Sequence, residues 1–380
     1  MLRKIIFIKQ YEPKEYCLLL RTSSIILLFL CIFSYPKAQN LSAYSDYKNY
    51  FFVFDDGITK ELEYEPIKTY QVGGNSIAYI DNSDNFKAYF NGKKYDLLDV
   101  PPNNFYSTDD LLVYFKNSIL SVFDKGEITT ISYRTNNYIV GDSLVGFFDE
   151  TMSSFKVYYQ GQITEVESAI DKPPFSNFKA GDNTLAYVNY NDHFKVFYHQ
   201  HVFDLESSSP VSFQAASNTV AYIDGNTKFL KAFYLGKPYI LENNSPSSFS
   251  VADDMVAYID NTGSFKIFYQ GQTIKLLSFE PSFYEAEDKM VVYYDKGFLS
   301  IFYKGKTVQL ENFIPIQYQK DFNSFAYRDR IDILKVFYDG ELQQISNEKV
   351  NSFELTRNVL KFNTGLNNLH FFCKGKIIHL

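Results

Sequence analysis

The stretch Val256-Ala257-Tyr258-Ile259-Asp260, followed after a polar turn by Phe265-Lys266-Ile267-Phe268-Tyr269-Gln270-Gly271, decides the fold of this 380-residue chain, because versions of it recur throughout. It returns, for example, as Ala78 to Gly92, Ala221 to Gly236 and Ala326 to Gly340. The residues that close the phrase are Gly57, Gly92, Gly126, Gly161, Gln200, Gly236, Gly271, Gly305, Gly340 and Gly375. Their mean spacing of about 35 residues predicts a tandem repeat architecture.

Each repeat contains four short segments that we expect to be strands. In the repeat quoted above they are Ser248–Val251, Met255–Ile259, Phe265–Tyr269 and Thr273–Leu277. A glycine before the fourth segment supplies the positive φ of a tight hairpin. The chain also holds 32 Tyr and 37 Phe but no Trp, and no segment shows sustained helical periodicity. Aromatic enrichment favours strands, so the sequence predicts an all-β protein.

Four short antiparallel strands, repeated head to tail, are typical of a β-propeller. We expect about nine complete four-stranded repeats and a partial N-terminal unit, Tyr50 to Glu63, that matches the third and fourth strands. The complete repeats end near Leu97, Ser132, Glu167, Glu206, Glu242, Leu277, Glu311, Ile345 and Leu380. Propellers usually have four to eight blades. The count therefore leaves open one large ring, two smaller rings, or a terminus that packs differently, with an open β-solenoid as the alternative fold.

The first 38 residues differ from the rest and read as a signal peptide. Basic groups precede an apolar run from Ile25 to Phe33, and the segment Tyr35-Pro36-Lys37-Ala38-Gln39 follows, which predicts cleavage near Ala38 or Gln39. The apolar run is short for a membrane span, so an uncleaved anchor is the second interpretation and no span is expected after cleavage. Cys31 lacks the small preceding residue of a lipoprotein signal. The predicted domains are residues 1–38, a signal peptide, and residues 39–380, a β-propeller.

The charge of the chain excludes nucleic acid as a partner class. The formal net charge is −7, and loss of the six basic and two acidic groups of the leader lowers it to −11. Of three cysteines only Cys373 lies outside the leader, so no internal disulfide is expected and stability must come from packing.

Two turns and a strand pair give the repeat a likeness to a known family. Val251 to Tyr258 and Ile267 to Gly271, closing at Leu276, resemble the repeat of TolB-like propellers. The family's Ser-Pro-Asp-Gly turn is replaced here by turns such as Gly141-Asp142-Ser143 and Gly181-Asp182-Asn183. The resemblance implies a periplasmic or secreted protein-binding module of bacteria and transfers no catalytic residue.

No set of residues forms a recognisable catalytic, cofactor or metal site, so none is predicted. His193, His199 and His201 share a parity along one hairpin, but they fall at positions that are exposed turns in other repeats. His370 and His379 lack an obvious carboxylate or cysteine partner. Three further series each recur at one position in six of the repeats and are expected to pack, pair or cap turns rather than bind ligands. They are Lys87, Lys156, Lys195, Lys231, Lys266 and Lys335; Asp81, Asp149, Asp224, Asp260, Asp295 and Asp329; and Tyr79, Tyr187, Tyr222, Tyr258, Tyr293 and Tyr327.

These observations predict an exported propeller, periplasmic, outer-surface or secreted, that binds a protein or a glycan of the cell envelope without a cofactor. Its site is expected on a ring face or in the central channel, where loops from all blades meet. A propeller hydrolase acting on glycans or peptides is the alternative, and it requires two or more carboxylates close together. A passive envelope component is the third interpretation.

Overall fold

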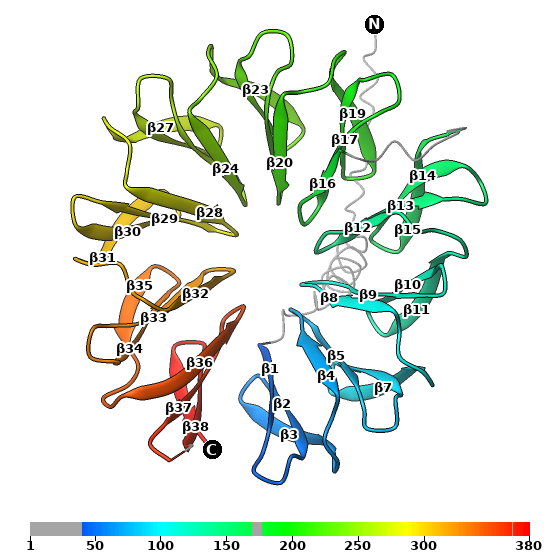
Figure 1. Cartoon of the computed structure of the whole chain (residues 1–380), viewed down its shortest axis with the longest axis vertical. Helices are drawn as coiled ribbons and strands as arrows, with labels where there is room; N and C mark the ends of the chain where they lie inside the picture. The colour runs from blue at the N-terminus through cyan, green and yellow to red at the C-terminus, as the bar shows by residue number, and fades with distance from the viewer. Residues whose placement is uncertain (1–39, 169–176, 367) are drawn as a thin grey trace, which may run out of the picture. The chain divides into compact units, whose positions relative to one another are not determined.

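The computed structural model describes residues 40–168, 177–366 and 368–380, which belong to the compact unit Gln39–Leu380. In these residues all regular elements are strands, and they form ten antiparallel sheets in chain order. Figure 1 shows the sheets as the blades of a ring, with the first strand of each blade toward the centre. No helix among the described residues is long and apolar enough to cross a membrane.

Nine of the ten described sheets have four strands, and each pairs its strands in sequence order. Strands within a sheet are neighbours in the chain because short turns join them, so each blade is a local unit. The first strands are β4 (Thr69–Val72), β8 (Asn104–Ser107), β12 (Tyr138–Val140), β16 (Phe178–Ala180), β20 (Ser212–Ala216), β24 (Ser248–Ala252), β28 (Phe283–Glu287), β32 (Tyr318–Asp321) and β36 (Val350–Thr356).

The second strands carry the most completely buried residues of each blade. They are β1 (Leu41–Ser45), β5 (Ser76–Ile80), β9 (Leu112–Lys116), β13 (Leu144–Asp149), β17 (Thr184–Val188), β21 (Thr219–Ile223), β25 (Met255–Ile259), β29 (Met290–Asp295), β33 (Ser324–Arg328) and β37 (Val359–Thr364). All five residues of β25 are buried, whichever face of the sheet they point to, because a neighbouring blade covers the sheet on either side.

The third and fourth strands form the outer hairpin of each blade. The third strands are β2 (Phe51–Asp55), β6 (Phe86–Phe90), β10 (Ile119–Asp124), β14 (Ser154–Tyr159), β18 (Phe194–Tyr198), β22 (Leu230–Tyr234), β26 (Phe265–Tyr269), β30 (Phe298–Tyr303), β34 (Leu334–Tyr338) and β38 (Asn368–Cys373). The fourth strands are β3 (Ile58–Glu63), β7 (Lys93–Leu98), β11 (Glu127–Ser132), β15 (Gln162–Glu167), β19 (His201–Glu206), β23 (Lys237–Glu242), β27 (Gln272–Leu277), β31 (Lys306–Glu311), β35 (Glu341–Gln344) and β39 (Lys376–His379).

The hairpin turn before the fourth strand has the predicted chemistry. In the seventh blade Gln270 and Gly271 have φ of 49° and 79°, the two positive values of a type I′ turn. The one repeat without glycine keeps this geometry, since Gln200 takes φ of 63° in its place. A side chain other than glycine is strained there, which makes this hairpin the irregular one of the ring.

The expected count of nine repeats and a partial unit was wrong. Strand β1 pairs with β2, and Ala43 lies opposite Val53, so residues 41–63 form a tenth blade with three described strands. Sequence reasoning missed β1 because Leu41–Ser45 directly follows residues 1–38, which were interpreted as a signal peptide.

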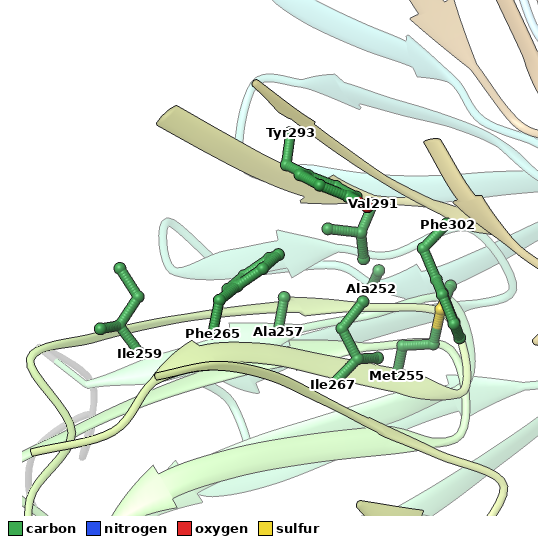
Figure 2. Packing of buried hydrophobic residues seen from close by; sticks show 9 residues of the cluster. All are labelled: Ala252, Met255, Ala257, Ile259, Phe265, Ile267, Val291, Tyr293 and Phe302. Carbon is green, nitrogen blue, oxygen red and sulfur yellow. The ribbon is translucent and has the colours of Figure 1, made fainter. Parts of the chain in front are cut away.

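The hydrophobic core lies between blades rather than within one sheet. Figure 2 shows Phe265 and Ile267 of the seventh blade packed toward Val291, Tyr293 and Phe302 of the eighth. Sheets stacked side by side bury aromatic and branched side chains between them, which explains the abundance of Tyr and Phe.

The ring closes by side-chain packing between its first and last blades. The rings of Phe54 and Phe371 stack at 4.2 Å, and both are fully buried. The ammonium of Lys374 lies 2.9 Å from the carboxylate of Asp56. In the described residues the tenth sheet contains only β36 to β39, so no N-terminal strand is exchanged into it to lock the ring.

Candidate functional site

The turns that join first to second strands meet around the centre of the ring, and we call them the turn ring. Hydrogen bonds run from one turn to the next. The amide of Ser143 donates to the carbonyl of Asp182 at 2.8 Å, and that of Lys289 donates to the carbonyl of Phe322 at 3.2 Å. The carboxylate of Asp288 accepts from the amide of Phe322 at 2.7 Å. These bonds between blades hold the polar side chains of the turns in fixed positions.

Five aspartates occupy one repeat position in the turn ring, five residues before the aromatic residue of the second strand. They are Asp109, Asp142, Asp182, Asp253 and Asp288. A hollow of about 270 Å³ lies among four of these turns, and Asp142, Asp182, Asp253 and Asp288 all line it. The ring geometry therefore brings together carboxyl groups that lie far apart in the sequence.

Two cations reach into the turn ring from the eighth and tenth blades. The guanidinium of Arg357 lies 2.5 Å from the carboxylate of Asp109. It passes so close to Gly74 that a Cβ there would lie 2.1 Å from its Nη1 atom. Lys289 and Arg357 both lie over the ring of Phe322, at 3.6 and 4.4 Å from its centroid. Cation–π contact lets Phe322 hold the two cations at the edge of the acidic cluster.

Burial and crowding keep protons on several of these carboxyl groups. Burial raises the pKa of Asp288 to about 8, with the charges of Asp321 and Asp253 adding to the effect. Burial also raises the pKa of Asp109 to about 7, against the opposing attraction of Arg357. The pKa of Asp182 is raised by burial and by its neighbour Asp253. Carboxyl groups that share a small volume resist ionising together.

The chemistry open to this site follows from those shifted pKa values. A cationic group that enters the hollow replaces protons and restores the ionised form, so binding is coupled to proton release. A carboxyl group that stays protonated near neutral pH can also act as a general acid beside an ionised one. No group of three or more potential metal ligands is found in the described part of the chain.

Five of the six predicted lysines pair with a carboxylate of the preceding blade, and five of the six predicted aspartates accept amides of their own turns, as expected. The ammonium of Lys266 lies 2.6 Å from Glu242 of the preceding blade and 2.9 Å from Asp260 of its own. The hydroxyl of Tyr258 donates to the same Glu242 at 2.9 Å. Asp260 also accepts the amide of Ser264, which caps its turn. We call this arrangement of Tyr, Glu, Lys and Asp the interblade cluster.

The interblade cluster recurs with small changes. Full versions are Tyr79, Glu63, Lys87 and Asp81; Tyr222, Glu206, Lys231 and Asp224; and Tyr327, Glu311, Lys335 and Asp329. Asn189 replaces the aspartate beside Lys195, and Lys156 pairs with Asp149 alone. Asp295 instead begins a two-residue turn, and Tyr293 packs in the core. The lysines are thus neutralised and do not form a positive rim.

The histidines lie in two blades. His193 precedes β18, whereas His199 lies in the turn after β18 and His201 begins β19, and the side chains of His199 and His201 are exposed. His370 and His379 form a cross-strand pair in the last blade, where their Nδ1 atoms lie 2.8 Å apart. The sequence pattern missed this pair because the two residues lie on strands whose register is set by the final hairpin.

The convergence of the turn aspartates was also missed, although the sequence holds a signal for it. Each aspartate precedes a buried aromatic residue by the same five positions, as Asp182 precedes Tyr187 and Asp253 precedes Tyr258. Residues at one repeat position of a closed ring lie at equivalent places around its axis, so a position beside the innermost strands brings its members together near that axis.

A sequence profile of the 10-bladed beta propeller domain matches residues 35–378. The chain therefore belongs to the 10-bladed β-propeller family, in agreement with its ten sheets. The TolB-like resemblance is confirmed only at the level of the propeller fold. No curated protein matches the chain.

Solved structures give distant matches. AztD from Citrobacter koseri is 12% identical, with 81% of this chain and 93% of that one covered and a TM-score of 0.36. The CRINKLY WD40 ectodomain of the receptor kinase ACR4 from Arabidopsis thaliana is 10% identical, with 66% and 99% covered and a TM-score of 0.34. PorZ of Porphyromonas gingivalis is 11% identical, with 88% and 51% covered and a TM-score of 0.29. Nothing about function follows from similarity at this level.

Proposed function

We propose that this protein is an exported binding module that recognises a positively charged group, such as a lysine or arginine side chain of a partner protein, at the turn ring. The observation that carries the proposal is the convergence of Asp142, Asp182, Asp253 and Asp288 on one hollow. Binding at the centre of a ring lets many blades contribute one residue each, as propellers commonly do.

Charge and size both support a cationic side chain as the ligand. Two nearby cations, Lys289 and Arg357, offset only part of the acidic charge, and both are held to one side over Phe322. A hollow of about 270 Å³ suits a side chain or a small amine rather than a folded domain. The raised pKa values of Asp288 and Asp109 leave the site partly protonated, and an entering cation can displace these protons.

The experiment is calorimetric titration of the secreted protein with trilysine, with acetylated trilysine as the uncharged comparison. We expect trilysine to bind and to release protons at pH 7, which is measured as a difference in apparent enthalpy between two buffers of unlike ionisation heat. The double variant Asp182→Asn, Asp288→Asn should weaken binding about tenfold or more.

The matched control removes two carboxylates elsewhere. Asp84 and Asp192 lie in the exposed turns between second and third strands, with φ of 72° and 62° that asparagine tolerates well. The variant Asp84→Asn, Asp192→Asn makes the same chemical replacement at two carboxyl groups outside the hollow and should bind trilysine as the parent does. Equal weakening in both variants would mean that trilysine senses only net charge, and the proposal would fail.

Export is part of the same proposal and rests on the basic and apolar order of the leader. Its test is N-terminal sequencing of the protein recovered from a bacterial host, which should give a start near Gln39 in the exported fraction. Recovery of the uncleaved chain from the cytoplasm would contradict it.

Hydrolysis is the second candidate function, because carboxyl groups do converge. Burial, the charge of Asp253 and a side-chain hydrogen bond with Asp142 all raise the pKa of Asp182. Asp182 paired with a second carboxyl group of the hollow could supply a general acid for cleavage of a glycan or peptide. The test is a panel of fluorogenic glycosides and peptides, with Asp182→Asn as the inactive comparison. Turnover that this variant retains would exclude the pair as catalytic.

A further inference from the structure

The last blade replaces all four members of the interblade cluster. Aligned on the closing glycines, the residues that stand in place of Tyr258, Glu242, Lys266 and Asp260 are Phe362, Ser346, His370 and Thr364. Six other blades hold a lysine at the position of His370. The last blade therefore presents the two nitrogens of an imidazole where those blades present an ammonium.

A second histidine stands directly opposite the first. His370 of β38 pairs with His379 of β39 on one side and with Phe362 of β37 on the other. Paired residues of neighbouring antiparallel strands lie on the same face of a sheet, so the three rings form a row. The ring centroids of His370 and His379 are 4.8 Å apart, and those of His370 and Phe362 are 5.0 Å apart. Strand register thus holds two imidazoles side by side.

The ring of His370 is oriented by its neighbours in β37. Its Nε2 atom lies 2.9 Å from the hydroxyl oxygen of Thr364, a side chain that is buried. This contact leaves Nδ1 facing His379, whose own Nδ1 atom lies 2.8 Å away. A histidine that binds a metal ion commonly makes a hydrogen bond with its other ring nitrogen, which fixes the orientation of the ring. Thr364 is placed to accept such a bond.

The two imidazoles have the charge state and the access that a metal ion needs. Burial and the charge of His379 lower the pKa of His370, so its ring is neutral near pH 7. The neutral imidazole is the form that binds metal ions. His379 is exposed, so an ion can reach the pair from solvent.

The separation of the two nitrogens selects the kind of ion. Two nitrogens that each lie about 2.0–2.1 Å from one ion are about 2.9 Å apart at a right angle and about 3.4 Å apart at the tetrahedral angle. The 2.8 Å between the Nδ1 atoms of His370 and His379 fits the right angle. Right angles between nitrogen ligands are typical of tetragonal copper(II) and nickel(II), and copper(II) has the higher affinity of the two.

We propose that His370 and His379 bind one copper(II) ion through their Nδ1 atoms, with water at its other positions. A small rotation of the exposed His379 ring directs both lone pairs to the ion. The proton that joins the two Nδ1 atoms in the free protein moves to Nε2 of His379, so both rings stay neutral. His370 continues to donate from Nε2 to Thr364, which is a positioning residue of this site.

The experiment is titration of the purified protein with copper(II) chloride at pH 7, with glycine as a competing chelator, followed by electron paramagnetic resonance. We expect one ion per chain, with a tetragonal spectrum that shows coupling to two imidazole nitrogens. His379→Gln should remove one nitrogen and weaken binding about tenfold or more, because the second ligand no longer acts within the same molecule. Thr364→Val keeps both nitrogens and should weaken binding about tenfold. Zinc(II) should bind more weakly than copper(II).

His201→Gln is the matched control, since His201 is also an exposed histidine of a fourth strand. It should bind copper(II) as the parent does. The variant Asp182→Asn, Asp288→Asn should do the same, which separates this site from the turn ring. Copper(II) should raise the melting temperature of the parent and not that of His379→Gln, and melts without metal show whether each variant is folded. A parent spectrum without two imidazole nitrogens, zinc(II) binding as tight as that of copper(II), or equal affinity of the parent and a folded His379→Gln would overturn the inference.

Discussion

Replacement of Lys266 by methionine tests whether the interblade cluster stabilises the ring. The ammonium of Lys266 lies within 2.9 Å of two carboxylates, Glu242 and Asp260, whose side chains are 22% and 7% exposed. Lys266→Met keeps most of the apolar stem and removes the charge. Glu242 then keeps the Tyr258 hydroxyl, and Asp260 keeps its turn amides.

The expected loss follows from the burial of the partners. Removal of one member of a fully buried ion pair costs about 3–5 kcal/mol. The Lys266 side chain is 20% exposed, and both carboxylates keep other donors, so screening and compensation reduce the loss in unfolding free energy to about 2 kcal/mol. Adding Glu242→Gln removes the unpaired charge, and the double variant should recover about 1 kcal/mol relative to the sum of the single variants.

The assay is urea unfolding followed by tyrosine fluorescence, since the chain has 32 Tyr and no Trp. Lys304→Met is the matched control, because Lys304 pairs with Asp339 at 2.6 Å but the two side chains are 64% and 54% exposed. It should cost less than about 1 kcal/mol. Hydrogen exchange should rise at the interface of the sixth and seventh blades in Lys266→Met only. Equal stabilities for the two variants would refute the reasoning.

Three further results are expected. Asp288→Asn should leave the free energy of unfolding unchanged at pH 4 and raise it by about 1 kcal/mol or more at pH 9. The folded pKa of Asp288 is about 8, so the contribution of its protonated carboxyl group to stability is present below the unfolded pKa and lost as pH rises through 8. Thermal melts across this range measure the difference. Phe371→Ala should cost about 3–4 kcal/mol and expose amides of the first and last blades to hydrogen exchange, since it removes the stack on Phe54 that closes the ring. Cys373 should react slowly with iodoacetamide in the folded protein at pH 8 and rapidly in urea, because burial raises the pKa of its thiol to about 11.

Most of the blade was predictable because its signals are local. The turn at Gly271, the strand from Phe265 to Tyr269 and the capping role of Asp260 each depend on residues within one repeat. Turn chemistry and strand pattern act over a few residues, and the repetition of the pattern averages out local irregularities.

What sequence reasoning missed depends on contacts between blades. Glu242 looks like an ordinary strand end, and only the stacking of the sixth and seventh blades brings it to Lys266. Arg357 reaches Asp109 across several blades, a contact that no spacing in the sequence indicates. Ring closure fixes these distances, and the number of blades, which sets the closure, could not be counted while β1 was unrecognised.

The acidity of the turn ring argues for a ligand site rather than a structural device. Crowded carboxyl groups with raised pKa values reduce stability as pH rises, so Asp288 weakens the fold near neutral pH. The same ring gains stability at its blade interfaces, where Lys266 and its equivalents lie between paired carboxylates. A purely structural turn position could hold asparagine and avoid the cost, as Asn183 and Asn218 hydrogen-bond across the next position of the turns. If Asp288→Asn lowers stability at pH 9, the carboxylates are structural after all; if it raises stability and weakens trilysine binding, the repulsion is the property that the ligand relieves.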